Sequence, residues 1–553
     1  MIGKFPPYKC SFVSSTNLRC NTETINPCFS TSNFTAAMLD LELSTSFLFC
    51  ILSLLFLFII NSKSIFTTFF SSSSKSSKIS AKIPRSYPLI GSFLAIYSYR
   101  HRVIQWTSDA VTSTPTSTFV LNRPLGRCQV IAANPSNVQH ILKTHFHIYQ
   151  KGIIIRTHVS DLLGDGIFNV DGENWKFQRQ VASHEFNTKS LRKFVETVVD
   201  TELSDRLIPI LSSAAANKTV IDFQDILQRF AFDNICKIAF GHDPAYLLPS
   251  LPQEKFAVAF DTAARISGER FRAFHPLFWK TKRFLDIGSE KQLRISANKV
   301  REFAKEIVKE KKQELGEKSS LESVDLLSRF LSSGHSDENF VTDIVISFIL
   351  AGRDTTSAAL TWFFWLISSH PDVENEILKE INEESEATSF EEVKGMVYTH
   401  ASLSESMRLY PPVPVDGKQA ADDDVLPDGT VIKKGMRVSY HPYAMGRSEK
   451  LWGSNWAEFR PERWLEMRDA AAGKWNFVAR DPYTYPVFQA GPRICLGKDM
   501  AFLQMKRVVS GVLRRFKVVP AFEEGVEPVF MAHLTSKMKG GFPVRIEERA
   551  GSF

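Results

Sequence analysis

The sequence has few cysteines and no pattern that would pair them. Seven occur in 553 residues, and none stand at the spacing of a zinc site or a disulfide framework. Between residues 92 and 553 there is no internal repeat, long linker, break in composition or nucleic-acid-binding motif. The net charge is a mild +7, and stretches such as 301–318 alternate in sign, which is typical of a solvated helix face. These absences argue against a disulfide scaffold, a repeat array and a nucleic-acid partner. They favour one large unit in a reducing compartment.

One cysteine stands in a specific local context. Residues 488–497 read Phe-Gln-Ala-Gly-Pro-Arg-Ile-Cys-Leu-Gly, and the apolar residues after them recur at three- and four-residue steps, which predicts a helix over 498–516. Cys495 therefore lies just before a helix N-terminus, where the dipole and free N–H groups favour an anionic sulfur. Gly491 and Gly497 can adopt backbone angles that other residues resist, and would let the backbone approach a flat ligand. Such a thiolate can be the proximal ligand of a haem iron; the alternative is a buried free thiol in a turn.

A polar motif interrupts a long apolar segment. Residues 340–369 are too long for a strand and predict a buried helix. Within this segment, residues 351–356 read Ala-Gly-Arg-Asp-Thr-Thr. A glycine inside a helix costs about 1 kcal/mol relative to alanine, and an acid with two hydroxyls in an apolar helix needs partners or a function. The alternative is a kinked helix whose threonines bond back to the preceding turn.

Weaker patterns accompany these two motifs. Glu405 and Arg408 are three residues apart in a helical stretch and share one face. Residues 459–464 read Phe-Arg-Pro-Glu-Arg-Trp, and Trp175 stands four residues before Arg179. Each pattern alone says little, because charged pairs at helical spacing are common on protein surfaces. Their order along one chain makes them informative.

In this order the motifs resemble those of the cytochromes P450, which are haem-thiolate monooxygenases. The resemblance runs from about residue 82 to the C-terminus. It implies a mainly α fold with small β-sheets (α+β), in which residues 92–553 form one haem-binding monooxygenase domain. It also implies haem b (iron protoporphyrin IX) as cofactor, O2 as co-substrate, and NADPH-derived electrons delivered by NADPH–cytochrome P450 reductase.

The resemblance also implies roles for individual residues. Cys495 is expected to bind the iron. Asp354 and Thr355 are expected to relay protons during oxygen activation, beside a glycine, Gly352, that leaves room for dioxygen. A buried structural cluster is expected from Glu405, Arg408 and Arg463. The other expected haem contacts are Phe488, Gly491 and Gly497 in the cysteine loop and the propionate donors Trp175, Arg179 and Arg493, with Lys418 and His441 as further candidates.

The first 91 residues are organised differently. Residues 43–62 carry no charge and would reach about 30 Å as a helix, enough to cross a bilayer core; a cleaved signal peptide is the competing interpretation. Basic residues follow and acids precede this segment, so the positive-inside rule predicts a catalytic domain in the cytosol. The resemblance implies that the membrane is that of the endoplasmic reticulum. We expect a single transmembrane anchor over 38–62 and a basic, serine-rich linker with a proline hinge over 63–91. Residues 1–37 are either an extension before a true start at Met38 or a plastid transit peptide.

The substrate prediction rests on resemblance within the family. The segments that resemble the plant fatty-acid omega-hydroxylases are 86–92, 166–172, 182–190 and 443–447. They imply hydroxylation of medium- and long-chain fatty acids at or near the omega carbon. The alternative is omega-oxidation of jasmonoyl-isoleucine. The intact acid–alcohol pair argues against the haem-thiolate isomerases and dehydratases of oxylipin metabolism, and against a non-catalytic haem-binding protein.

The resemblance also indicates where the substrate would lie. The expected cavity walls are 154–168, 346–351, 413–415 and 530–534, and within them Phe168, Phe348, Ala351, Val413 and Val415. Omega-hydroxylation requires selection by position, because a terminal methyl C–H bond is stronger than those of the neighbouring methylenes. A basic partner for the substrate carboxylate is expected near the cavity mouth, at Arg156 or His158.

Overall fold

The computed structural model describes residues 84–186, 188–251, 255–317, 325–333, 337–383, 389–469, 474–523 and 526–549. The chain divides into two units, Met1–Lys78 and Ile79–Phe553, and every described residue belongs to the second. The predicted N-terminal extension, the anchor and most of the linker lie outside the described residues. None of the described helices combines the length and apolar composition that a membrane crossing needs.

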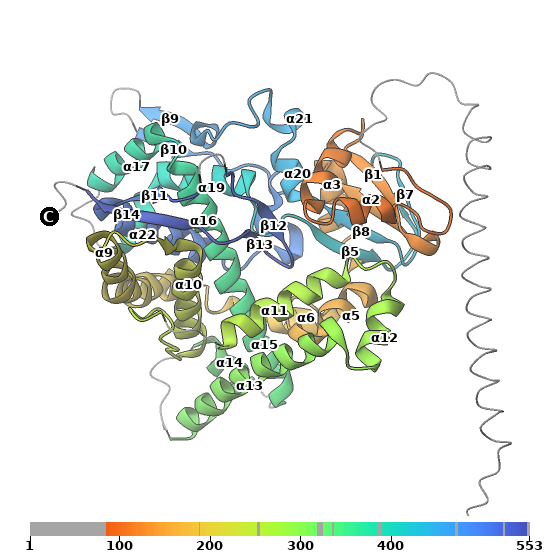
Figure 1. The fold of residues 1–553 in the computed structure, drawn as a ribbon, viewed down its shortest axis with the longest axis horizontal. Coiled ribbons are helices and arrows are strands. Elements are labelled where there is room, and N and C mark those ends of the chain that lie inside the picture. Colours follow the sequence, from red (N-terminus) through yellow and green to blue (C-terminus); the bar gives the residue numbers. More distant parts are fainter. Residues whose placement is uncertain are drawn as a thin grey trace, which may run out of the picture. The chain divides into compact units, whose positions relative to one another are not determined.

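Helices form most of the described chain (Figure 1). The α-helices are α2 (Phe93–Ser98), α3 (Val103–Thr112), α4 (Pro135–Gln139), α5 (Gly152–Leu163), α6 (Gly172–Ser183), α7 (Thr188–Lys193), α8 (Asp200–Glu202), α9 (Ile208–Ala216), α10 (Phe223–Phe240), α11 (Lys255–Arg270), α12 (Pro276–Phe284), α13 (Gly288–Glu317), α14 (Leu326–Ser332), α15 (Glu338–Ile349), α16 (Thr355–Ile367), α17 (Pro371–Glu383), α18 (Ser389–Gly395), α19 (Val397–Leu409), α20 (Pro442–Gly446), α21 (Glu449–Trp452) and α22 (Lys498–Arg515).

Short helical turns of other types lie between them. The π-helical turns are η3 (His140–Thr144), η4 (Phe194–Val199), η5 (Leu203–Leu207) and η6 (Leu350–Asp354). The 3₁₀ turns are η2 (Pro124–Gly126), η7 (Pro461–Trp464), η8 (Pro486–Phe488) and η9 (Gly491–Arg493). Two of the π turns contribute to sites described below: η3 contains His140, and η6 contains Gly352 and Asp354.

The strands form small sheets. The largest has five strands in the order β1-β2-β8-β5-β3; β2 and β8 are parallel, and its other neighbours are antiparallel. The strands are β1 (Thr118–Asn122), β2 (Cys128–Ala132), β3 (Tyr149–Gln150), β4 (Ile221–Asp222), β5 (Asp416–Ala420), β6 (Asp424–Val425), β7 (Val431–Ile432), β8 (Arg437–Tyr440), β9 (Leu465–Asp469), β10 (Lys474–Phe477), β11 (Phe516–Pro520), β12 (Phe530–Ala532), β13 (Ser536–Met538) and β14 (Pro543–Glu548). The expected mainly α fold with small sheets is confirmed.

A single helical stretch, α15–η6–α16, runs through the core. Its side chains are buried almost throughout, as an all-round apolar helix requires. It packs against α13 through α15 and against α10 and α19 through α16, and Figure 1 shows it as the long green-to-teal path through the helices. The predicted helix over 340–369 is therefore confirmed, apart from the π turn η6, which apolar periodicity does not reveal.

The helix after the cysteine is also close to the prediction. α22 covers Lys498–Arg515 and buries Phe502, Met505 and Val509. It ends one residue earlier than the predicted 498–516, because Phe516 begins β11 and pairs with Glu548 of β14. Phe516 continues the apolar spacing of the helix but is buried as the first residue of a strand, so apolar spacing does not place this boundary.

Candidate active site

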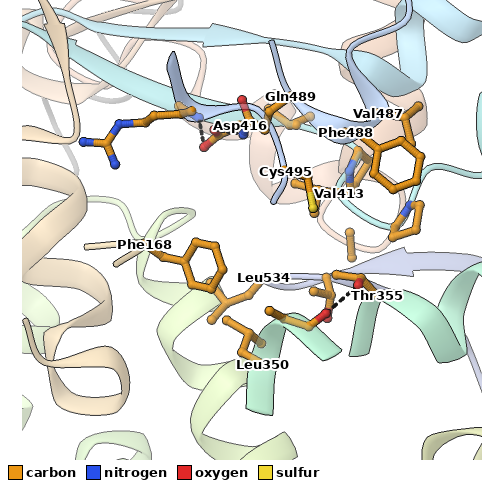
Figure 2. A pocket seen from close by; sticks show the side chains of 18 of the residues that line it. Phe168, Leu350, Thr355, Val413, Asp416, Val487, Phe488, Gln489, Cys495 and Leu534 are labelled. Carbon is orange, nitrogen blue, oxygen red and sulfur yellow. Dashed lines mark hydrogen bonds between the residues drawn. The ribbon is translucent and has the colours of Figure 1, made fainter. Parts of the chain in front are cut away.

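A cavity of about 520 Å³ lies between the cysteine loop and the central helical stretch. Its walls come from α5, α6, η6, β5, the turn between β12 and β13, and the loop that ends in Gly497. Figure 2 shows Cys495 and Phe488 on one side of this space and Leu350 and Thr355 on the other. The fold therefore brings the cysteine loop and the polar helix motif to a common cavity.

The backbone of the cysteine loop is fixed by close contacts. The Cys495 N–H donates to the Phe488 carbonyl at 2.8 Å. Gly491 has a φ of 66°, and a Cβ there would lie 2.1 Å from the Leu142 carbonyl oxygen, so no other residue fits. Gly497 has a φ of −88°, which any residue can adopt, and it precedes α22 as its N-cap. The prediction of special backbone angles is right for Gly491 and wrong for Gly497.

The Cys495 thiol is accessible from the cavity. Desolvation by the surrounding protein raises its pKa, although the backbone N–H of Gly497 and the charge of Arg179 act in the opposite direction. In the protein alone, desolvation therefore acts against the thiolate that the position before α22 is expected to favour. A thiol that coordinates a metal ion is deprotonated by the ion's own charge.

Gln489 holds an unusual conformation within the same loop. Its φ of 63° and ψ of −178° lie in a region that is essentially reserved for glycine and costs other residues about 1–3 kcal/mol. Its side-chain amide donates to Asp416 at 2.6 Å, and its side-chain carbonyl accepts from Tyr440. Asp416 also pairs with Lys151 at 3.2 Å. Sequence analysis missed this support, because only the fold brings β5 and β8 beside the loop.

Trp175 lies close to two arginines on the cavity wall. The guanidinium carbon of Arg493 is 4.5 Å from the Trp175 ring centroid, and that of Arg179 is 5.9 Å from it. Arg493 also donates to the Val170 carbonyl and the Asp171 carboxylate, both at 2.8 Å. Burial lowers the pKa of both guanidinium groups, which nevertheless stay charged in proteins. The three side chains expected to bind a propionate thus converge on one part of the wall.

The two further propionate candidates differ. The Lys418 ammonium is buried, has no hydrogen-bond partner and lies 4.0 Å from the Asp416 carboxylate; burial lowers its pKa to about 7. His441 lines the cavity, but its Nε2 lies 3.0 Å from the Thr107 hydroxyl and its Nδ1 accepts from the Ala444 N–H at 3.1 Å. His441 is therefore the cap of α20, and a contact of its ring with a propionate stays a prediction.

The acid and the alcohol of the polar motif occupy different places. Thr355 lines the cavity, and its hydroxyl donates to the Ala351 carbonyl at 2.6 Å. Asp354 is buried outside the cavity lining and accepts from Arg353 at 2.7 Å and from Thr535 at 3.1 Å. Thr535 itself lines the cavity, so its hydroxyl connects the acid to that space. Sequence analysis missed Thr535, which no local motif marks.

Gly352 is required by the packing of two helices. A Cβ at this position would lie 2.5 Å from the side chain of Ile235 on α10, closer than real contacts allow. The residue belongs to the π turn η6, and π turns are frequent at functional sites. This packing requirement adds a second reason for the glycine to the expected space for dioxygen.

Glu405 is the centre of a buried hydrogen-bonded cluster. Arg408 donates to both of its carboxylate oxygens at 2.8 Å, Arg463 donates at 3.0 Å, and the Trp464 indole donates at 2.9 Å. Glu405 and Arg408 are fully buried, and such charges are tolerated only when they are fully paired. The ring of Trp464 lies 4.7 Å from that of Tyr485, immediately before η8. This ring contact connects the cluster to the cysteine loop.

The side chains expected to meet the substrate all line the cavity: Phe168, Phe348, Ala351, Val413 and Val415. Neither candidate for the substrate carboxylate does. Arg156 pairs with Asp165 at 2.8 Å on the surface. His158 hydrogen-bonds to the Ile154 carbonyl, and burial lowers its pKa to about 4, so that its ring is neutral. The structure therefore contradicts this part of the prediction.

Known proteins are similar to this chain over most of its length. The sequence matches the family Cytochrome P450 over residues 82–542. Cytochrome P450 94A2 of Vicia sativa is 66% identical over 478 residues, which cover 86% of this chain and 93% of that protein. Cytochrome P450 94A1 of the same plant is 63% identical over 467 residues, or 84% and 91% of the two chains. Cytochrome P450 94B3 of Arabidopsis thaliana is 48% identical over 491 residues, or 87% and 96%.

The chain belongs to the cytochrome P450 family. Within the family it is close to the 94 group. It is thus a haem-dependent monooxygenase that uses O2 and receives electrons from a reductase.

The residues around the cavity fit a haem. Cys495 offers a sulfur ligand, and the bare α-carbon of Gly491 lets the loop pack without a side chain. Arg179 and Arg493 bring positive charge to the wall, where they could bind the anionic propionates. The Lys418 ammonium is buried without a hydrogen-bond partner, but it does not line the cavity, so its contact with a propionate stays a prediction. When bound, the haem supplies the activation of O2. The protein supplies the ligand, the counter-charges and the shape of the cavity.

Proposed function

We propose that this monooxygenase hydroxylates medium- and long-chain fatty acids at or near the omega carbon. The observation that carries the proposal is a group of three arginines, Arg123, Arg272 and Arg437, on the wall of a largely apolar cavity. Within the described part of the chain, none of the three forms an ion pair with a carboxylate. A fatty acid has both the anionic head and the apolar chain that such a cavity favours.

The three arginines lie around one aromatic residue. The Arg437 guanidinium carbon is 4.7 Å from the Phe271 ring centroid, Arg123 donates to the Phe271 carbonyl, and Arg272 is the next residue in the chain. Burial lowers the pKa of Arg437 to about 10; burial and the neighbouring charges of Arg437 and Arg127 lower that of Arg123 to about 9. The Nε of Arg437 is buried without a hydrogen-bond partner. Positive charge held in this way favours an anion, because charge-assisted hydrogen bonds would offset the desolvation.

Other residues of the cavity wall are suited to the apolar chain. Phe348, Leu350 and Leu534 line the cavity next to Thr355, and Figure 2 shows Leu350 and Leu534 facing the side that carries Cys495. Each methylene buried there contributes about 0.8 kcal/mol, so affinity should rise with chain length until the cavity is full. A terminal methyl then reacts in preference to weaker internal C–H bonds only if these walls restrict which carbon is presented.

The polar groups of the central helix have a proposed role in proton delivery. The Thr355 hydroxyl is on the cavity wall, and the Thr535 hydroxyl joins the buried Asp354 carboxylate to the same space. Incorporation of one oxygen atom into a C–H bond releases the other as water, so protons must enter a largely apolar cavity. Asp354 would be the proton source, and the hydroxyls of Thr355 and Thr535 would pass protons from it into the cavity.

Jasmonoyl-isoleucine is the competing substrate. It also carries a carboxylate, so the arginines alone do not exclude it. It adds an amide, whose burial without a hydrogen-bond partner is unfavourable. A fatty acid needs polar contacts at one end only. This requirement matches a cavity wall that has arginines in one part and aliphatic side chains in another.

One experiment decides between the substrates. The reductase-reconstituted enzyme is incubated with fatty acids of several lengths, with their methyl esters and with jasmonoyl-isoleucine, and products are identified by mass spectrometry. We expect hydroxylation at or next to the terminal methyl, with kcat/KM higher for the free acids than for the conjugate. A higher kcat/KM for the conjugate, or mid-chain oxidation of the fatty acids, would refute the proposal.

A variant tests the arginines separately. Arg437→Gln is expected to raise KM for the free acids and to change KM for their methyl esters little, since the esters carry no charge. Arg283→Gln is the matched control, because Arg283 is half-exposed and paired with Asp161. An equal rise in KM for acids and esters would show that Arg437 supports the shape of the cavity and does not bind the substrate carboxylate.

The proposal also includes the N-terminal organisation. Residues 38–62 would anchor the protein in the endoplasmic reticulum membrane, residues 63–91 would link the anchor to the domain, and residues 92–553 would face the cytosol, where NADPH–cytochrome P450 reductase donates electrons. Deletion of residues 1–37 is then expected to leave location and activity unchanged. A plastid location of the full-length protein that is lost on this deletion would identify a transit peptide instead.

A further inference from the structure

Three ligating side chains cluster outside the cavity. His140 Nε2 lies 2.8 Å and His145 Nδ1 lies 3.1 Å from the same carboxylate oxygen of Asp424. One ligand atom from each residue lies within 4.8 Å of the others, and the two imidazole centroids are 4.0 Å apart. Ligand atoms around a tetrahedral zinc ion lie roughly 3.3 Å apart, because its bonds to nitrogen and oxygen are about 2.0–2.2 Å long. Small side-chain adjustments would therefore give this cluster the dimensions of a metal site.

A π turn aligns the two histidines. The His145 N–H donates to the His140 carbonyl at 2.9 Å, which is the five-residue hydrogen bond that defines η3. In an α-helix, side chains five residues apart point roughly 140° away from each other. The wider π turn brings them to one side. Such turns are rare and are frequently found at functional sites.

The carboxylate comes from a separate segment and is oriented by a third. Asp424 belongs to β6, and the hydroxyl of Tyr149 in β3 donates to it at 2.7 Å. A hydrogen-bonded partner that orients a ligating carboxylate is usual around metal ions. The side chains of His140 and Asp424 are 13% and 9% exposed, whereas that of His145 is 36% exposed. The cluster is thus closed on most sides and open at His145, where an ion and a water molecule can enter.

We infer that His140, His145 and Asp424 bind a divalent transition-metal ion, for which Zn²⁺ is the best match. Two imidazoles and one carboxylate, with a fourth position left to water, are a common zinc ligand set. Ca²⁺ and Mg²⁺ prefer oxygen ligands and fit this set poorly. The competing explanation is a metal-free cluster in which Asp424 only accepts hydrogen bonds from the two imidazoles and Tyr149.

The position of the cluster gives the ion a structural role. The ion would join η3 to β6, and η3 also supplies the Leu142 carbonyl that lies against Gly491 in the cysteine loop. A more rigid η3 would therefore support the cysteine loop, although no residue of η3 lines the cavity. An ion that binds only the folded state raises Tm in proportion to the logarithm of its concentration.

Zinc content and coordination test the inference directly. Haem-loaded full-length protein is stripped with EDTA, dialysed against ZnCl₂ and analysed for zinc. We expect one ion per chain, and a zinc K-edge absorption spectrum, to which haem iron does not contribute, with two imidazoles and oxygen at about 2.0–2.2 Å. Loss of an outer partner of a metal site costs about 10–100-fold in affinity, so His145→Ala and Asp424→Asn should weaken binding at least that much.

Controls separate loss of the site from loss of the fold. The CO-bound ferrous spectrum shows whether each variant still holds haem; His145 is half-exposed, so His145→Ala tests the site even where Asp424→Asn fails to fold. His101→Ala, a surface histidine outside the cluster, should bind zinc like the wild type. Zinc should raise the Tm of the wild type and of His101→Ala, but not of His145→Ala. Equal zinc content in the wild type and His145→Ala, sulfur or a single imidazole among the ligands, or equal Tm shifts would overturn the inference.

Discussion

Thr535 donates a hydrogen bond of 3.1 Å to Asp354 across 181 positions of the sequence. The other oxygen of Asp354 accepts from Arg353 at 2.7 Å, and Arg353 also pairs with Asp261 at 2.8 Å. Lys537 donates to Asp261 at 2.7 Å. A charge network thus holds the acid away from the cavity, and the Thr535 hydroxyl connects it to that space. Thr535, from the C-terminal part of the chain, therefore joins Asp354 to the cavity that Thr355 also lines.

This arrangement leads to a prediction about coupling. Thr355→Ala should retain haem and substrate but release hydrogen peroxide, because a hydroxyl on the cavity wall is lost; general acid–base groups contribute about 10²–10⁴-fold to rates. Thr535→Val should shift coupling in the same direction but less, since Thr355 remains. The measurement is product and peroxide formed per NADPH consumed. Thr361→Ala is the control, because Thr361 lies in the same helix and bonds back to Ser357. Wild-type coupling in Thr355→Ala would contradict the relay.

The cysteine ligand gives a spectroscopic prediction. Cys495→Ala should lose the thiolate spectrum of the CO-bound ferrous haem and all turnover. Among the described residues that line the cavity, the remaining sulfur atoms are then the thioethers of methionines, which cannot form a thiolate. Cys128→Ser is the matched control, since Cys128 is partly exposed in β2 and outside the cavity lining. Retention of the thiolate spectrum by Cys495→Ala would disprove the assignment.

The two helices that meet at Gly352 give a prediction about stability. Gly352→Ala should destabilise the protein by about 1–3 kcal/mol, because the new Cβ would overlap Ile235. Adding Ile235→Ala should recover part of this loss. Gly316→Ala is the control: no atom lies within 4 Å of a Cβ there, so it should stabilise α13 by up to about 1 kcal/mol. Urea unfolding followed by circular dichroism measures all four proteins, and equal effects of the two glycine substitutions would rule out the packing explanation.

The buried cluster around Glu405 should be sensitive to loss of charge. Glu405→Gln leaves two buried arginines without their counter-charge, and breaking a buried ion pair costs about 3–5 kcal/mol. Haem retention and the urea midpoint should both fall. Glu173→Gln breaks an exposed pair with Lys176 and should change little. Similar urea midpoints for the two variants would show that the cluster is not needed for stability.

Buried histidines should make the protein sensitive to acid. Burial lowers the pKa of His158 and His533 to about 4, and of His400 and His441 to about 3. An unfolded histidine titrates near about 6.5, so the unfolded chain binds more protons below that pH. Stability should therefore decline as the pH falls from about 6.5 towards 3, and be insensitive to these groups above that window. His158→Gln should make the urea midpoint depend less steeply on pH between about 6.5 and 4; an unchanged slope would count against the pKa shift of His158.

Much of the site follows from short motifs. The cysteine loop, the polar helix motif and the pair of Trp175 and Arg179 each lie within a few residues, where the spacing of side chains is set by local geometry. Gly491 is an example: a backbone angle that other residues resist is expected there, and the structure shows a φ of 66°. That its close neighbour is the Leu142 carbonyl is visible only in the structure. Local patterns also indicate the buried helix over 340–369, since an apolar segment of that length has few other stable conformations in water.

The sequence by itself thus determined the family, the mainly α fold, the position of Cys495 and the residues of the central helix. Only the tertiary structure decided that Thr535 reaches Asp354, that Arg123, Arg272 and Arg437 meet on one wall, and that His140 and His145 face Asp424. These relationships join segments far apart in the chain or depend on a π turn, and neither leaves a periodic signal. The physical reason is that side-chain spacing along one element is fixed by backbone geometry, whereas contacts between elements follow from how the whole core packs.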